Sequence, residues 1–131
     1  RLDPPHRRAM RRGAQVSGAT ATATATKHDS GKSRHELLSD LAIEELAKVL
    51  TAGAVKYSPD NWRKGMEWRR LIGAARRHIA AFSSGQDIDP EFGLSHLAHA
   101  MCCLLFLEEY RQTGVGTDDR FKLGPKPPPH T

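Results

Sequence analysis

The chain has 131 residues, of which 38% are hydrophobic, and it carries a net charge of +5. This length predicts one domain with tails, and the lack of an apolar run of ~18 residues argues against a membrane-spanning helix. Residues 1–34 hold eight Lys or Arg against two Asp, whereas residues 35–131 hold twelve against thirteen Asp or Glu. Because the excess positive charge belongs to the N-terminal segment, we do not expect the body of the protein to bind nucleic acid or a membrane.

The chain begins with a basic, Ala/Thr-rich segment, residues 1–26, which we expect to form a flexible and extended arm. The Ala-Thr alternation at residues 19–26 has the period of a strand, but its side chains are too small to bury much area. Residues 123–131 are rich in proline and predict an extended tail. The body is therefore expected to span residues 27–122.

Three helices are predicted in the body, at approximately residues 33–56, 68–82 and 93–112, from apolar side chains that recur at helical spacing. The second helix is expected to stop at Ser83-Ser84-Gly85 and the third at Gly114. No convincing strand alternation occurs between them. These patterns predict an all-α fold.

The third predicted helix is apolar on every side over residues 97–107, which is typical of a helix enclosed by other helices or by another subunit. Three helices make a thin core, so we expect a homo-oligomer, either a dimer or a tetramer. The adjacent Cys102 and Cys103 point about 100° apart on a helix and will not readily form a disulfide. They predict reduced, buried thiols and a cytoplasmic protein.

The start of the third predicted helix is the first place where chemistry is expected. His96 and His99 are three residues apart and share one helical face. They follow three carboxylates, those of Asp87, Asp89 and Glu91. The histidines are either core-edge residues hydrogen-bonded to carboxylates or backbone, or metal ligands. A zinc site with Cys103 is a weaker alternative, because no second Cys or His cluster completes it.

The acidic residues themselves resemble the beginning of a calcium loop. That interpretation fails, because Phe92 and Ala98 stand where such a loop needs glycine and glutamate. The remaining alternative is a solvated loop whose acidic residues favour the N-terminus of the following helix.

Glu45 is a second candidate, because a helical wheel places it inside the apolar arc of the first predicted helix, with Glu44 at the edge of that arc. A carboxylate that faces inward needs a cation or a hydrogen-bond donor. Glu45 is therefore expected either to form a salt bridge with an arginine of the second helix or to bind a metal ion.

The loop at residues 56–64 combines cations with aromatic rings. Such a loop can hold a phosphate with its lysines and a base against its ring. The alternative is an ordinary polar loop with Trp62 tucked into the core.

Several of these motifs, taken in order, resemble one known family. They are Lys27-His-Asp-Ser-Gly-Lys-Ser-Arg-His-Glu-Leu-Leu, Glu45-Leu-Ala-Lys-Val-Leu-Thr-Ala-Gly-Ala-Val-Lys-Tyr, Asn61-Trp, Arg77-His78 and Asp87-Ile-Asp-Pro-Glu-Phe-Gly-Leu-Ser-His-Leu-Ala-His-Ala. Over residues 27–112 the chain is similar to the phage dATP/dGTP diphosphohydrolase domain, which is related to the MazG-like all-α nucleotide pyrophosphohydrolases and includes MazZ-type members.

The resemblance implies a MazG-like helical bundle completed by oligomerisation. It also implies hydrolysis of a purine deoxynucleoside triphosphate, dGTP or dATP, to the monophosphate and pyrophosphate, adjusting the nucleotide pool for phage DNA synthesis in the host cytoplasm. Two or more Mg²⁺ or Mn²⁺ ions are expected between the Glu45 helix and the helix that begins near Glu91.

The candidate residues follow from this resemblance together with charge and position. The expected metal ligands and catalytic carboxylates are Glu44, Glu45 and Glu91, with His96 and His99 as ligands, as partners that brace the carboxylates, or as phosphate contacts. The expected substrate contacts are Lys32, Arg34, Lys56, Asn61, Trp62, Lys64, Arg77 and His78. The chain departs from the MazG pattern, because Lys48 and the two histidines stand where that pattern has acidic residues.

Two other functions are compatible with the sequence. One is a non-catalytic phage accessory protein that binds nucleic acid through the basic arm. The other is a histidine–aspartate metallohydrolase that uses His78, His96 and His99, although the chain has no adjacent His-Asp pair outside residues 28–29.

Overall fold

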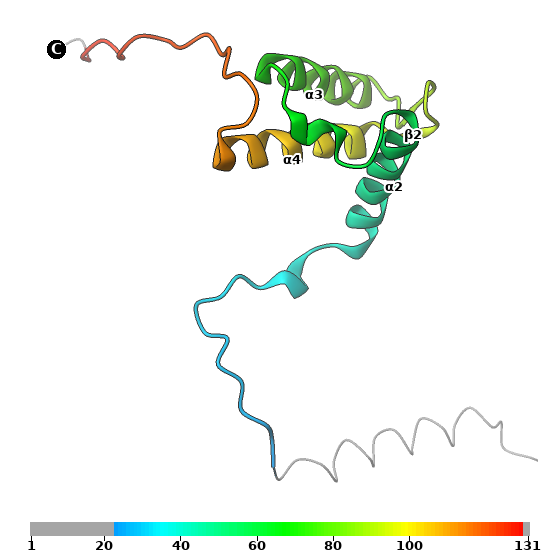
Figure 1. The fold of residues 1–131 in the computed structure, drawn as a ribbon, viewed down its shortest axis with the longest axis vertical. Coiled ribbons are helices and arrows are strands. Elements are labelled where there is room, and N and C mark those ends of the chain that lie inside the picture. The colour runs from blue at the N-terminus through cyan, green and yellow to red at the C-terminus, as the bar shows by residue number, and fades with distance from the viewer. Residues whose placement is uncertain (1–22, 130–131) are drawn as a thin grey trace, which may run out of the picture. The chain divides into compact units, whose positions relative to one another are not determined.

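A computed structural model describes residues 23–129, which form two separate units (Figure 1). The first unit ends at Glu36 and contains a turn in which the Lys32 amide donates to the Asp29 carbonyl oxygen. A short 3-10 helix, η1 (His35–Leu37), leads into the second unit, which begins at Leu37 and holds the α-helices of the described residues. Most of the predicted basic arm lies outside the described residues, and its described part, 23–26, has no regular secondary structure.

Helix α2 (Asp40–Lys56) begins later than the sequence predicted. The Ser39 hydroxyl oxygen accepts a hydrogen bond from the Ala42 amide at 3.2 Å. Ser39 is therefore the N-cap, and the helix begins at Asp40. The predicted start near residue 33 was wrong, because Leu37 and Leu38 precede this cap. Leu41 is 84% exposed, and only Leu46 and Val49 of this helix are buried.

Helices α3 (Trp68–Ser83) and α4 (His96–Thr113) lie side by side and form the largest helix contact of the chain. Their predicted bounds are confirmed to within a few residues. Ser95 caps α4 by accepting from the Ala98 amide, and Gly114, with a φ of 76°, ends it. A 3-10 helix, η2 (Asn61–Lys64), fills part of the loop before α3.

Two short strands join α3 to α4. Strands β1 (Ile88–Asp89) and β2 (Leu94–Ser95) pair antiparallel as a hairpin, with Ile88 opposite Ser95 and Asp89 opposite Leu94. No strand was predicted here, because two residues are too few to show an alternating pattern. The fold of the described residues is otherwise helical, so the predicted all-α class is confirmed.

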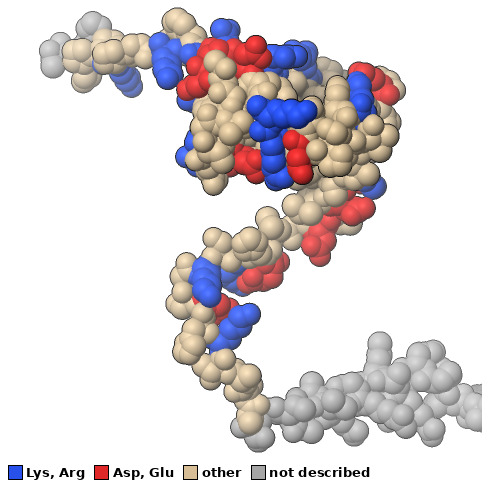
Figure 2. Space-filling model, viewed as in Figure 1, with Lys and Arg blue, Asp and Glu red and all other residues tan. Residues whose placement is uncertain are grey.

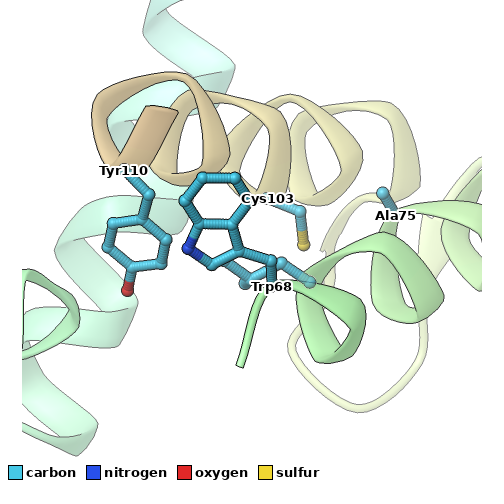
Figure 3. Packing of buried hydrophobic residues seen from close by; sticks show 5 residues of the cluster. Trp68, Ala75, Cys103 and Tyr110 are labelled. Carbon is cyan, nitrogen blue, oxygen red and sulfur yellow. The ribbon is translucent and has the colours of Figure 1, made fainter. Parts of the chain in front are cut away.

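The core consists of two clusters that share helix α4. One cluster joins α3 to the middle and the C-terminal end of α4, and Figure 3 labels four of its residues, Trp68, Ala75, Cys103 and Tyr110. The other joins α2 to α4 through Leu46, Val49, Ala98 and Cys102.

The vicinal cysteines are buried free thiols, as the sequence predicted. Because burial disfavours a thiolate, the pKa of Cys102 is raised to about 12, and that of Cys103 is also raised. Neither thiol is therefore a reactive nucleophile at neutral pH.

The segment that follows α4 crosses the start of α3, and we call this crossing the clasp (residues 115–117 against residues 66–68). Thr117 forms a parallel bridge with Glu67. The Trp68 amide donates to the Thr117 carbonyl at 3.0 Å, and the Thr117 amide donates to the Met66 carbonyl at 3.2 Å. Gly116 has a φ of 79°, and a Cβ there would collide with the Met66 carbonyl oxygen, so the clasp requires glycine.

The described residues, 23–129, do not cover helix α4 on every side. Leu97 and Leu104 are 41% and 53% exposed, although both belong to the continuously apolar segment of the helix. Homo-oligomerisation would cover them and stays a prediction. Within residues 23–129, no helix combines the length and the apolar character needed to cross a bilayer.

Charged side chains of both signs are mixed on the face of the body shown in Figure 2. Several of them form exposed pairs, among them Arg63 with Glu109 and Arg111 with Glu108. This mixture agrees with the nearly balanced charge of residues 35–131.

Candidate functional site

Side chains from α3, the hairpin and α4 meet at the N-terminal end of α4. The turn before the hairpin contributes Gln86, strand β1 contributes Asp89, and α4 contributes His96 and His99. The His96 amide donates to the Asp87 carbonyl at 3.0 Å, which closes the hairpin against the first turn of α4. His78 reaches the same place from α3. We call these five side chains, those of His78, Gln86, Asp89, His96 and His99, the histidine cluster.

His96 is buried and both of its ring nitrogens have partners. Its Nε2 lies 2.7 Å from Gln86 Oε1, and its Nδ1 lies 2.9 Å from His78 Nδ1. An amide oxygen can only accept, so His96 Nε2 carries the proton in this bond. In neutral His96 the Nδ1 atom is then an acceptor, and His78 Nδ1–H donates to it.

His99 is held between two rings but has an unpaired nitrogen. Its ring stacks on His78, with centroids 4.6 Å apart and planes at 9°, and it meets Phe92 at 5.5 Å and 49°. Its Nε2 is buried without a hydrogen-bond partner and lies 3.5 Å from Asp89 Oδ2. A buried polar atom without a partner is costly, so this nitrogen has unused capacity to bind.

Asp89 is a buried carboxylate on the hairpin. Its Oδ1 accepts from the Glu91 amide at 3.0 Å, and its carbonyl oxygen accepts from the Gly93 amide at 2.7 Å. The bond to Oδ1 holds the carboxylate with its Oδ2 toward His99, and the backbone bond holds the turn around it.

His78 and His99 favour their neutral form. Burial lowers the pKa of His78, and the neighbouring His99 and His96 lower it further. Burial also lowers the pKa of His99, although the Asp89 carboxylate acts in the opposite direction. Neutral imidazole is the form that binds metal ions.

A carboxylate oxygen and a neutral imidazole nitrogen 3.5 Å apart are a donor set that suits a divalent metal ion. Among residues 23–129, no three or more His, Cys, Asp and Glu side chains are grouped so that they could hold such an ion. Asp89 and His99 would therefore supply two ligands and leave the other positions to water and substrate phosphates. Magnesium sites that bind phosphates commonly have few protein ligands.

Comparison with known proteins identifies the family. The model of the family described as "dATP/dGTP diphosphohydrolase, N-terminal" matches residues 22–120. The chain belongs to this dATP/dGTP diphosphohydrolase N-terminal family. A curated "dATP/dGTP diphosphohydrolase" of Salmonella phage PMBT28 is 37% identical over 97 residues, which are 74% of this chain. The chain spans only 33% of the length of that relative. No solved structure matches the chain.

The predicted cage of two facing acidic helices is not formed within one chain of this diphosphohydrolase-family domain. Glu45 is half-exposed and pairs with Lys48 at 2.8 Å, so the expectation that it faces inward was wrong. Glu44 is exposed. Glu91 is also exposed and lies 4.0 Å from Lys56. Lys56 follows Glu45 by eleven residues of α2, about 16 Å along the helix axis, so Glu45 and Glu91 do not converge.

Trp62 is a core residue of the family domain. Phe106 stacks on one face of its indole at 4.3 Å and 13°, and the Arg63 guanidinium lies 4.7 Å from the ring centroid. The Tyr110 hydroxyl donates to the Trp62 carbonyl oxygen. These contacts agree with the alternative that Trp62 packs against the core, where it is half-buried, and a role in holding a base stays a prediction.

Within the body, the other predicted substrate contacts do not belong to the histidine cluster. Asn61 is half-buried at the start of η2, and Lys64 and Arg77 are exposed. Lys32 and Arg34 belong to the first unit, where Arg34 pairs with Glu36 at 2.8 Å. Of the predicted substrate contacts, only His78 lies in the histidine cluster.

Two residues of the cluster, Gln86 and Asp89, were not among the predicted site residues. Asp89 was noticed in the acidic triplet, but its burial depends on the hairpin, which the sequence pattern did not reveal. No sequence signal marked Gln86, because its role depends on where His96 lies.

Proposed function

We propose that this domain hydrolyses a purine deoxynucleoside triphosphate, dGTP or dATP, to the monophosphate and pyrophosphate. The observation that carries the proposal is the family match over residues 22–120. The phage relative is named a dATP/dGTP diphosphohydrolase, which supports the same substrates. The histidine cluster adds a chemically suitable site. Under this proposal the protein adjusts the purine nucleotide pool in the cytoplasm of a phage-infected host.

We further propose that hydrolysis requires Mg²⁺ or Mn²⁺. A bound divalent ion would neutralise phosphate charge and lower the pKa of a water molecule toward neutrality. Asp89 and His99 would hold it, since they combine a buried carboxylate with the unpaired nitrogen. The ring of His78 fixes the orientation of His99 by stacking, and Gln86 fixes that of His96.

The other predicted acidic residues have conditional roles. Glu91 lies two residues from Asp89 on the same turn, so it is close enough to serve a second ion. Glu44 is exposed and Glu45 is half-exposed on α2, and under this proposal a metal role for them involves a second copy of the chain. The Lys56 ammonium group, 4.0 Å from Glu91, is a candidate to hold the polyphosphate.

The proposal is tested by incubating the purified chain with each of the four deoxynucleoside triphosphates and with Mg²⁺, Mn²⁺ or EDTA. We expect dGTP or dATP to yield equimolar monophosphate and pyrophosphate, and EDTA to abolish turnover. Formation of diphosphate and orthophosphate would indicate cleavage at a different bond. The absence of any product from folded protein with either metal ion would refute the proposal.

A further inference from the structure

The proposed substrate carries a flat purine base, and bases bind proteins largely by stacking on aromatic rings. The chain has eight aromatic residues of the Trp, Tyr and Phe types, all within the described part. Trp68 and Tyr110 are buried, and Trp62 and Phe106 cover each other. The exposed rings are those of Tyr57, Phe82, Phe92 and Phe121.

Among these exposed rings, only those of Tyr57 and Phe92 contact the same cation. The Lys56 ammonium nitrogen lies 5.3 Å from the ring centroid of Tyr57 and 4.9 Å from that of Phe92. Tyr57 directly follows α2, whereas Phe92 lies in the hairpin turn, so the lysine joins two segments that are far apart in the sequence. Tyr57 is 65% exposed and Phe92 is 39% exposed.

This pair of rings adjoins the histidine cluster. Phe92 packs against His99 at 5.5 Å, and His99 carries the unpaired nitrogen beside Asp89. A nucleotide with its base at the rings would therefore direct its phosphates toward the carboxylate and imidazole groups. A single cation, Lys56, lies next to the rings and within 4.0 Å of Glu91.

We propose that Tyr57 and Phe92 form the platform on which the purine base stacks. The inference rests on the proposed function and adds the residues that recognise the base. In the structure, the Lys56 ammonium lies against both rings as a cation–π contact. Cation–π contacts at exposed sites are weak, so a base can displace the ammonium group from the rings. Lys56 then becomes available to neutralise the phosphates.

The platform predicts a base-dependent effect on binding, which separates it from a general effect on the site. The ligands are an α,β-methylene analogue of dGTP, which cannot be cleaved at the proposed bond, and inorganic triphosphate, which has no base. For Tyr57→Ala we expect the Kd of the dGTP analogue to rise roughly 5- to 100-fold, as loss of one stacked ring does elsewhere. The Kd of inorganic triphosphate should be unchanged.

Matched variants separate stacking from other causes. Tyr57→Phe and Tyr57→Trp keep a ring and should bind the analogue as the native chain does. Phe121→Ala removes an exposed ring at a site without contact to Lys56 and should have no effect on either ligand. Phe92→Leu, which keeps an apolar contact with His99, should weaken binding of the analogue but not of triphosphate.

Three outcomes would overturn the platform. The first is an unchanged Kd of the analogue for Tyr57→Ala, and the second is an equal loss of affinity for the analogue and for triphosphate. The third is a change in the molar mass of Tyr57→Ala relative to the native chain, measured by light scattering, which would make the rings a subunit interface. Failure of the proposed function is recognised separately, since base-dependent binding without hydrolysis of dGTP would refute the activity but support the platform. Normal hydrolysis of dGTP by Tyr57→Ala with an unchanged KM would support the activity but refute the platform.

Discussion

The two ends of the α3–α4 pair are built from the same helices but differ in chemistry. From the middle of α4 to its C-terminal end, Trp68, Leu71, Cys103 and Tyr110 form an apolar cluster. Its polar atoms have partners, since Trp68 Nε1 donates to the Val115 carbonyl at 3.0 Å and the Tyr110 hydroxyl donates to the Trp62 carbonyl. At the N-terminal end, the same helices bring histidines together, and His99 Nε2 has no partner.

This difference separates stability from binding. Satisfied polar groups within an apolar core fix the packing of α3 against α4 and offer nothing to a ligand. The histidine cluster contributes less apolar burial and keeps an unpaired nitrogen beside a carboxylate. We therefore expect substitutions at the apolar end to change the free energy of unfolding, and substitutions at the histidine cluster to change activity.

Trp68→Ala should have the largest effect. Removing a buried indole typically costs about 3–5 kcal/mol, and here it also leaves the Val115 carbonyl without its donor. Urea unfolding monitored by circular dichroism should show a lower midpoint. Because Trp62 remains, its fluorescence provides an independent probe of the same transition. A change of less than about 1 kcal/mol would contradict the assignment of Trp68 to the main core.

Asp89→Asn should lower turnover by about 100-fold or more, because it removes the buried charge that faces His99 and keeps the shape of the side chain. Pyrophosphate release is the measurement. Asp87→Asn is the matched control, since Asp87 is an exposed carboxylate two residues earlier, and it should retain activity. If the two variants lose activity equally, the loop acts through its overall charge and not through Asp89.

The smallest expected effect is on the pH dependence of stability in metal-free protein. The pKa values of His78 and His99 are lower in the folded protein than in the unfolded chain. The unfolded state therefore binds protons first as the pH falls below about 6.5. The free energy of unfolding should decrease between pH 7.5 and pH 5.5. His78→Asn should show a shallower decrease, and an equally steep decrease would place the titrating groups elsewhere.

Local signals explain how much of this fold could be predicted. The second and third helices were predicted to within a few residues, because their apolar periodicity and the glycines that end them are local. The hairpin was not predicted, since its strands are two residues long. The start of α2 was predicted too early, because apolar Leu37 and Leu38 extend the periodic pattern into a segment that is not helical beyond η1.

The site was only partly predictable for a related reason. His96 and His99 were recognised from their spacing, but their partners come from α3 and the hairpin. The inward orientation of Glu45 was inferred from an arc that included Leu41, which is exposed. Within the described residues, α4 covers only the side of α2 that carries Leu46 and Val49. A helical wheel gives the angular position of each side chain around the helix, but it does not show how much of the helix surface a neighbouring helix will bury.

The clasp has a mechanical consequence for this domain. A pull on the chain beyond Asp119 meets backbone bonds at Thr117 and the bond from the Arg69 amide to Asp119 Oδ1 before it reaches α4. The load then passes into the first turn of α3, next to the apolar cluster. The histidine cluster lies at the other end of these helices. A force applied to the C-terminal segment therefore acts on the clasp before it acts on the groups proposed to bind the nucleotide.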